Sequence, residues 1–255
     1  MFDLEGKICL ITGGAGSIGL ATAQVLAKHG ARLALVDLDS TALDQACAVT
    51  FGEAAPDVLR LAADVTDEDA VRRAVDHAVQ HFGGLDVVVS NAGIFGTVAA
   101  VQDYPTEVFD QVMAVHVRGA FLLAKHAVPH IRDGGSIVLT SSVAATRGDP
   151  GVYGYITAKH ALTGLMRVLA RDLAPRGIRV NAIAPGPVAN SFQAKVEKDL
   201  GALIGCDGAV FFDEMIPMGR HAIADEIANA ILFLASGQSS FTTGHVLMAD
   251  GGMSI

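Results

Sequence analysis

The residues best suited to chemistry are Tyr155 and Lys159, four positions apart, with Ser142 thirteen positions before the tyrosine. On a helix, residues four apart share a face, so the phenol and the ammonium group would point into the same space. A neighbouring positive charge lowers the pKa of a tyrosine from its ordinary value of about 10. The serine hydroxyl could hold a substrate oxygen while a proton moves between this oxygen and the phenol. The trio suits the interconversion of an alcohol and a carbonyl compound, although an exposed pair on an amphipathic helix would have the same spacing.

A second pattern, near the N-terminus, is typical of a dinucleotide-binding unit. Residues 7–12 form an apolar run that predicts a buried strand, and a glycine-rich turn leads from it into a helical stretch at 20–29. Glycines let the backbone approach a pyrophosphate, whose charge is favoured by the free N–H groups at the start of a helix.

The acid that follows the next predicted strand indicates which dinucleotide binds. This strand, residues 31–36, ends at Asp37, where a carboxylate can accept hydrogen bonds from the adenosine ribose and would repel a 2′-phosphate. Leu38 and the two residues after it supply no cation for such a phosphate. The sequence therefore predicts NAD rather than NADP, unless Asp37 is only a polar strand end or a helix cap.

Composition and charge exclude several classes of protein. Just over half of the 255 residues are hydrophobic, as expected for a sheet buried on both faces. The net charge of −9 is unlike that of nucleic-acid-binding proteins. No apolar stretch reaches the ~18 residues that span a bilayer, and the N-terminus lacks the features of a signal peptide, so we expect a cytoplasmic protein without a membrane anchor. The scattered cysteines are expected to be reduced thiols: Cys9, Cys47 and Cys206.

The rest of the chain alternates between strand and helix patterns. Helices are predicted at 40–51, 67–82, 106–128, 154–174 and 224–235, and strands at 58–64, 85–90, 135–141, 177–184 and 245–249. This alternation predicts an α/β fold: one domain over residues 1–255, with a Rossmann-like doubly wound sheet of about seven mainly parallel strands and helices on both faces. Ligands of such sheets lie beyond the carboxyl ends of the strands. Residues 188–217 lack a clear periodicity, and we expect this irregular insertion to form a substrate lid at that edge.

The order of these motifs resembles that of the short-chain dehydrogenase/reductase family, over essentially the whole chain. The matching motifs are Thr12-Gly-Gly-Ala-Gly-Ser-Ile-Gly19, Asp64-Val65, Asn91-Ala-Gly93, Ser142, Tyr155-x-x-x-Lys159, Pro185-Gly186 and Asp250-Gly-Gly252. The resemblance implies an NAD(H)-dependent alcohol dehydrogenase/reductase, and the sequence as a whole favours a small, partly hydrophobic secondary alcohol or diol as substrate. It also implies a homotetramer.

The resemblance assigns a role to each matching residue. Tyr155 would transfer the proton, Ser142 would orient the substrate oxygen, and Lys159 would bind the nicotinamide ribose and lower the tyrosine pKa. The predicted cofactor-binding residues are Gly13, Gly16, Ser17, Ile18, Gly19, Asp37, Leu38, Asp64, Val65, Asn91, Ala92, Gly93, Tyr155, Lys159, Pro185, Gly186, Val188 and Asn190. Five apolar side chains would line a substrate pocket or, equally, form the core of the lid: Phe95, Phe192, Phe211, Phe212 and Met215.

The chain departs from the family pattern at four positions. Ser17 replaces a glycine of the phosphate loop, where its hydroxyl could contact phosphate, and Ser90 and Asn190 exchange one hydrogen-bonding group for another. His116 stands where the family generally places an asparagine that organises a water relay behind the lysine. Because histidine titrates nearest to neutrality, His116 could carry protons itself; it could equally fill a helix position without a chemical role.

Two other functions and a metal site are alternatives to this interpretation. An acyl-carrier-protein-type ketoreductase would be expected to use NADPH and to carry basic residues around the glycine turn, where none is found. A non-catalytic dinucleotide-binding regulatory protein would explain the changes at Ser17 and His116, but not an intact catalytic trio. The histidine pairs at 77/81 and 126/130 have helical spacing but no third ligand, so no metal site is predicted.

Overall fold

A parallel sheet forms the centre of the protein. The structure is a computed structural model that describes residues 3–52 and 58–255. In these residues seven strands pair in the order β3-β2-β1-β4-β5-β6-β7, and every pairing is parallel. The predicted Rossmann-like α/β fold is therefore confirmed. The strand order reverses between β1 and β4, which is where sheets of this kind open a crevice for a ligand.

Most strands and helices lie within a few residues of their predicted bounds. The strands are β1 (Ile8–Thr12), β2 (Arg32–Asp37), β3 (Val58–Ala62), β4 (Leu85–Ser90), β5 (Ile131–Thr140), β6 (Arg179–Pro185) and β7 (Val246–Ala249). The α-helices are α1 (Ser17–Lys28), α2 (Ser40–Phe51), α3 (Glu68–Phe82), α4 (Thr106–Met113), α5 (Gly119–Ala127), α6 (Tyr153–Leu173), α7 (Ser191–Ile204), α8 (Gly208–Met215) and α9 (Ala224–Ala235). None of the described helices combines the length and the apolar character needed to cross a bilayer.

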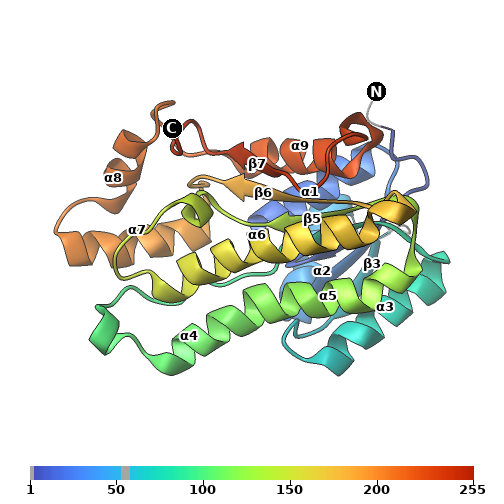
Figure 1. The fold of residues 1–255 in the computed structure, drawn as a ribbon, viewed down its shortest axis with the longest axis horizontal. Helices are drawn as coiled ribbons and strands as arrows, with labels where there is room; N and C mark the ends of the chain where they lie inside the picture. The colour runs from blue at the N-terminus through green and yellow to red at the C-terminus, as the bar shows by residue number, and fades with distance from the viewer. Residues whose placement is uncertain (1–2, 53–57) are drawn as a thin grey trace.

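Helices cover the sheet on both sides (Figure 1). Side chains alternate between the faces of a strand, so Ile8 and Leu10 of β1 pack with α3, α5 and α6, whereas Cys9 and Ile11 pack with α1, α2 and α9. Burial on both faces explains why the strands read as continuous apolar runs rather than as alternating patterns.

Residues 188–217 contain two helices, which corrects the expectation of an irregular insertion. Asn190 caps α7 by accepting a hydrogen bond from the backbone N of Gln193 at 2.8 Å, and Asp207 caps α8 through the backbone N of Ala209 at 2.9 Å. Gly205, with φ of 74°, ends α7 in a left-handed conformation that favours glycine. The two helices lie at one end of the sheet, apart from both covering layers (Figure 1). Local caps thus build helices that the hydrophobic periodicity does not predict.

Candidate active site

A cavity of about 830 Å³ lies at the carboxyl ends of the strands. All the predicted site residues line it except Gly19. Gly19 instead allows the start of α1 to approach the glycine turn, because a Cβ at this position would lie 2.1 Å from the carbonyl oxygen of Gly13. The sheet edge therefore brings together side chains that are far apart in the sequence, as the fold class requires.

Ser142, Tyr155 and Lys159 meet at this edge of the sheet. Ser142 follows β5, and its Oγ accepts a hydrogen bond from the backbone N of Ala144 at 3.1 Å, which orients the hydroxyl at the start of a short 3₁₀ turn. Tyr155 and Lys159 lie on α6, with Lys159 Nζ 5.2 Å from the centre of the tyrosine ring. Lys159 Nζ also donates to the carbonyl oxygen of Thr140 at 2.8 Å. The trio has the composition and proximity needed for proton transfer to or from an oxygen.

Burial, rather than the neighbouring lysine, dominates the protonation of Tyr155. Desolvation raises the pKa of Tyr155 to about 12, and a hydrogen bond with the Ser142 side chain opposes this rise. Burial also lowers the pKa of Lys159 to about 7, so this side chain is only partly charged near neutrality. In the protein alone, the pKa of Tyr155 is thus raised by burial rather than lowered as the spacing to Lys159 suggests. The phenol is protonated at neutral pH, which suits it to donate a proton to a substrate oxygen.

His116 lies in a π-helical turn, Ala114–Arg118, that joins α4 to α5 and interrupts the single helix predicted there. Its Nε2 lies 2.7 Å from the carbonyl oxygen of Ile94 and 3.1 Å from the backbone N of the same residue. The first contact uses a ring proton on Nε2, and the second uses a lone pair there. Nδ1 is buried and has no hydrogen-bond partner among the described residues. The ring packs against Gly93, where a Cβ would lie 2.4 Å from His116 Cε1.

The environment of His116 keeps its ring neutral. Burial, and secondarily the charge of Lys159, lowers the pKa of His116 to about 3. This direction favours the alternative in which His116 fills a helix position over the one in which it carries protons near neutrality. The ring is 3% exposed and its centre lies 5.6 Å from that of Tyr155, so the residue is part of the wall behind the catalytic tyrosine.

The glycine turn is braced by residues from neighbouring strands. Asp37, at the end of β2, accepts a hydrogen bond from the backbone N of Ala15 at 2.9 Å through Oδ2. Asn91, after β4, donates from Nδ2 to the carbonyl oxygens of Thr12 and Gly13, at 3.2 Å each. The side chain of Asn91 thus positions the turn, whereas its neighbours Ala92 and Gly93 line the cavity.

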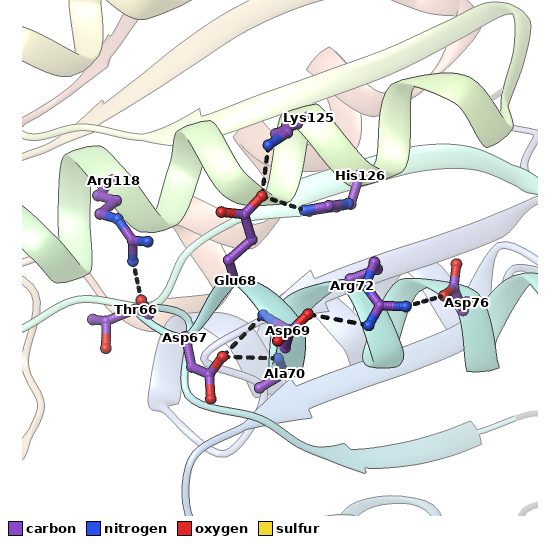
Figure 2. A network of polar contacts seen from close by, with 10 residues as sticks. All are labelled: Thr66, Asp67, Glu68, Asp69, Ala70, Arg72, Asp76, Arg118, Lys125 and His126. Atoms are coloured by element: carbon purple, nitrogen blue, oxygen red, sulfur yellow. Dashed lines mark hydrogen bonds and ion pairs between the residues drawn. The ribbon is translucent and has the colours of Figure 1, made fainter.

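The segment after β3 is held by a polar network on α3 and α5. Asp64 Oδ1 accepts from both the backbone N and the hydroxyl of Thr66, at 2.8 Å each. Arg118 donates to the Thr66 carbonyl oxygen, and Glu68 accepts from Lys125 at 2.6 Å and contacts His126 at 3.3 Å (Figure 2). These bonds fix Asp64 and Val65 as one wall of the cavity.

Two of the residues that depart from the family pattern bond to each other. Asn190 Nδ2 donates to Ser17 Oγ at 2.9 Å, while Asn190 Oδ1 caps α7. The start of α7 is thereby attached to the start of α1. The pair joins the phosphate-loop region to the segment that carries Phe192.

The end of the cavity beyond Tyr155 is aromatic and aliphatic. The ring of Phe95 lies 5.3 Å from that of Tyr155, and the ring of Phe192 lies 6.2 Å from both. Phe212 and Met215 line the cavity and also pack on the buried side chains of Val143, Ile216 and Met253. Phe212 and Met215 therefore fit both alternatives left open by the sequence, pocket wall and lid core, whereas Phe95, Phe192 and Phe211 fit the pocket wall.

Comparison with known proteins agrees with this geometry. A family model described as enoyl-(acyl carrier protein) reductase matches residues 13–254. Short-chain dehydrogenase reductase 5 of Arabidopsis thaliana is 40% identical over 256 residues, which cover 99% of this chain and 96% of the relative. The crystal structure of levodione reductase superposes with a TM-score of 0.93 at 36% identity and 98% coverage of both chains. That of NAD⁺-bound xylitol dehydrogenase gives 0.91 at 37% identity, over 98% of this chain and 99% of that one.

The chain belongs to the short-chain dehydrogenase/reductase family. It is an oxidoreductase by this membership, and the family binds a nicotinamide dinucleotide. The residues present fit such a group. The start of α1 faces the cavity, and the residue before the helix, Gly16, provides no side-chain cap, so the first amides of the helix can meet a pyrophosphate.

Several cavity residues of this short-chain dehydrogenase/reductase are not evident from the sequence. Arg147 and Asp149 lie at the cavity and pair with each other at 3.0 Å. Val196 and Leu200 of α7 add to its apolar wall. The spacing of Phe192, Val196 and Leu200, four residues apart, was the available signal for a helix that presents one apolar face.

Proposed function

We propose that the protein is an NAD-dependent oxidoreductase that interconverts a small, partly hydrophobic secondary alcohol or diol and its ketone. The observation that carries this proposal is the placement of Ser142, Tyr155 and Lys159 between a dinucleotide cleft and an apolar chamber. The polar, titratable groups lie where the dinucleotide cleft meets the apolar chamber. The chamber itself is formed by aromatic and aliphatic side chains. Such a site holds an apolar molecule with its one reacting oxygen at the tyrosine.

The side chains divide the chemistry between them, with the bound dinucleotide supplying or accepting the hydride. During ketone reduction, Tyr155 donates its proton to the carbonyl oxygen, and its raised pKa keeps that proton in place until the oxygen gains charge. Ser142 holds the same oxygen by a hydrogen bond. During alcohol oxidation the proton returns to Tyr155. The ammonium form of Lys159 stabilises the phenolate left after proton donation.

Charge at the adenosine end of the cavity supports NAD. Asp37 and Asp64 both line this end, and Leu38 lies beside them. Among the described residues that line the cavity, the cationic side chains are Lys159, in the catalytic trio, and Arg147, which is paired with Asp149. A 2′-phosphate would therefore meet carboxylates and no unpaired cation.

The substrate class is supported by the chamber and by the names of similar proteins. Levodione reductase and xylitol dehydrogenase are named for a carbonyl compound and a polyol. The chamber of this chain is lined by Phe95, Phe192 and Phe211, whose side chains cannot form hydrogen bonds with hydroxyl groups. It therefore favours a compound with few polar groups over a sugar alcohol. Of these two similar proteins, we therefore expect levodione reductase to be the better guide to the substrate of this chain.

We further propose that the protein is a homotetramer. Phe121 on α5 is 50% exposed and Val168 on α6 is 67% exposed, so each helix presents an apolar side chain to solvent. Single apolar side chains are normal on a protein surface, so the proposal rests on the family, whose members usually associate through their long helices. Light scattering should give the mass of four chains of 26.3 kDa each, and a monomer mass at micromolar concentration would contradict the proposal.

A second candidate function is reduction of a ketone carried on an acyl carrier protein. The name of a relative from Thermotoga maritima, 3-oxoacyl-[acyl-carrier-protein] reductase, favours it, since this chain is 38% identical to it over 258 residues. Such a protein would prefer NADPH and a long thioester, and an acidic carrier would need a basic surface near the cavity mouth. The carboxylates at Asp37 and Asp64 oppose the first requirement.

One assay separates these candidates. Cyclohexanol, borneol and xylitol are oxidised with NAD or NADP while the absorbance of the reduced dinucleotide is followed, and an acetoacetyl thioester is tested in the reverse direction with NADH and NADPH. We expect the cyclic alcohols with NAD to give the highest kcat/KM. Preference for NADPH and the thioester would support the carrier-protein function instead.

The cofactor preference has its own variant. The double substitution Asp37→Ala with Leu38→Arg removes a repulsion, adds a phosphate partner and should shift preference toward NADP. Because Asp37 also holds the N–H of Ala15, some affinity for NAD should be lost as well. Equal kcat/KM for the two dinucleotides in the unmodified protein would contradict the proposed preference.

A further inference from the structure

A histidine outside the catalytic site is held between two carboxylates. His221 lies in the segment between α8 and α9, and its ring Nε2 is 2.6 Å from Glu197 Oε1 of α7. Its Nδ1 is 2.7 Å from Asp213 Oδ1 of α8. The side chains of His221 and Glu197 are 12% and 16% exposed, so water screens the first of these contacts only weakly. We call these three residues the histidine clamp.

The two short contacts require a protonated ring. A neutral imidazole donates from one nitrogen and presents a lone pair at the other, and here that lone pair would face a carboxylate oxygen. The imidazolium donates at both nitrogens, and its positive charge is opposite in sign to that of the two carboxylates. Arg220, the adjacent cation, cannot take this part because its guanidinium forms two bonds with Glu226 of α9, at 2.9 and 2.6 Å.

The histidine clamp joins the lid helices to the loops at the edge of the sheet. The residue after His221, Ala222, donates from its backbone N to the carbonyl oxygen of Pro187 at 2.9 Å and accepts from the backbone N of Ala189 at 2.8 Å. His221 is therefore anchored to the segment that follows β6. Through Glu197 and Asp213 this anchor holds both α7 and α8.

The lid helices in turn form a wall of the substrate chamber. Glu197 follows Val196, and Asp213 follows Phe212, and both of these apolar residues line the cavity. The clamp thus lies one residue away from the chamber on each helix, while its own polar groups contact neither the catalytic trio nor the glycine turn. In the described part of the chain no group of three His, Cys, Asp or Glu side chains is arranged to hold a metal ion, so the clamp is not a metal site.

We propose that His221 is a positioning residue: bonded to Glu197 and Asp213 at its two ring nitrogens, it holds α7 and α8 against the substrate chamber, and loss of these bonds weakens substrate binding while the chemical step is preserved. The substrate readout rests on the proposed function. The structural readout does not, because it follows the backbone of α7 and α8 directly.

The kinetic test compares the wild type with His221→Gln, which keeps a polar side chain but cannot be a cation. KM and kcat for cyclohexanol with saturating NAD are measured at neutral pH. We expect the ratio of KM in the variant to KM in the wild type to be about five or more, the range expected when charge-assisted bonds are lost. The kcat values should agree within about twofold.

Matched variants separate the clamp from general effects of substitution. Glu197→Gln should repeat the pattern, because it removes one of the two anionic partners. His77→Gln on the exposed face of α3 and Glu214→Gln, an exposed carboxylate beside Asp213, should leave KM unchanged. A KM ratio of one in His221→Gln would overturn the positioning role, and an equally raised ratio in the two control variants would overturn the role of the clamp.

Hydrogen–deuterium exchange gives the test that needs no turnover. Amides of residues 191–201 and 208–215 should exchange at least about fivefold faster in His221→Gln than in the wild type, with α6 as the internal reference. Equal exchange would overturn the proposal even if every alcohol assay failed. Unequal exchange in the absence of any turnover would instead count against the proposed function and leave the clamp supported.

Discussion

The environment of a side chain decides its chemistry, and in His116 this environment differs from what the residue type predicts. An imidazole ordinarily titrates near neutrality, yet burial and Lys159 hold the pKa of His116 at about 3. The ring is neutral throughout the working range. What remains is a buried ring nitrogen, Nδ1, that has no partner among the described residues. We therefore expect His116 to act as a neutral hydrogen-bond acceptor near Lys159 rather than as a group that changes charge.

Substitution of His116 should affect acid stability in a defined direction. The folded-state pKa of about 3 lies below the ordinary value of about 6.5, so the contribution to stability is complete above about pH 6.5 and is lost as the pH falls toward 3. Between pH 7 and pH 5 the wild type should lose about 2 kcal/mol more unfolding free energy than His116→Asn. Urea denaturation at the two pH values measures this difference, and equal losses would show that the ring is not desolvated.

The same substitutions have kinetic consequences. His116→Asn should remain active because it keeps a neutral hydrogen-bonding group, whereas His116→Leu should lower kcat with little change in NAD binding. Neither substitution should remove an inflection between about pH 5 and 8, since His116 does not titrate there. If His116→Leu equals the wild type in kcat, the residue only fills space.

The protonation of Tyr155 predicts how the two directions of reaction depend on pH. Because burial raises the pKa of Tyr155 to about 12, the phenolate fraction of the empty site increases about tenfold per pH unit between pH 7 and 10. Alcohol oxidation, in which the phenol must accept a proton, should show kcat/KM rising through this range. Ketone reduction should not rise. A plateau in the oxidation profile that begins below pH 8 would mean that burial does not dominate in the working enzyme.

At the scale of elements, end caps explain where the sequence is informative and where it is not. The strands and α9 follow from apolar runs and periodicity, and the predicted bounds of β4 and α9 agree with the structure. Helices α7 and α8 depend on single capping residues, Asn190 and Asp207, and carry mixed apolar and charged side chains. Periodicity over a long window cannot detect a helix that is specified mainly by its first residue.

One helix ends on a buried cation whose removal should be costly. Arg179 of β6 is 8% exposed and donates to the carbonyl oxygens of Leu234 and Ser236, at 2.8 and 3.0 Å, where α9 ends. Burial lowers the pKa of Arg179, but these carbonyls and the negative end of the helix dipole offset the cost of holding its charge. Arg179→Met should lower the unfolding free energy by about 2 to 3 kcal/mol, because it leaves carbonyl groups unpaired in the interior.

A surface arginine provides the control for this prediction. Arg72 pairs with Asp69 and Asp76 on α3, and its side chain is 49% exposed (Figure 2). Arg72→Met should change the unfolding free energy by less than about 0.5 kcal/mol. Chemical denaturation of both variants tests the contrast, and a loss of similar size in the two would show that Arg179 is no more than another surface charge.

At the scale of the whole molecule, the fold class carried most of the information about the site. Once seven parallel strands are assigned, their carboxyl ends must lie together, so Asp37, Asn91, Ser142 and Pro185 could be placed on one edge from the sequence. The contacts between side chains could not. The bond from Asn190 to Ser17 joins residues 173 positions apart, and the histidine clamp joins three segments, so neither follows from local spacing. The desolvation that sets the protonation of Tyr155 and His116 likewise exists only after the chain has folded.

The most direct test of the central claim, that Tyr155 of this chain transfers the proton in an NAD-dependent reaction, is the turnover of Tyr155→Phe beside that of the wild type. The substitution removes one hydroxyl and keeps the ring that packs against Phe95 and Phe192, so the dinucleotide cleft should stay intact. With cyclohexanol and saturating NAD, kcat should fall at least a thousandfold while the Kd for NAD, measured by calorimetry, changes by less than about threefold. Retention of more than about a tenth of the wild-type kcat would contradict the account.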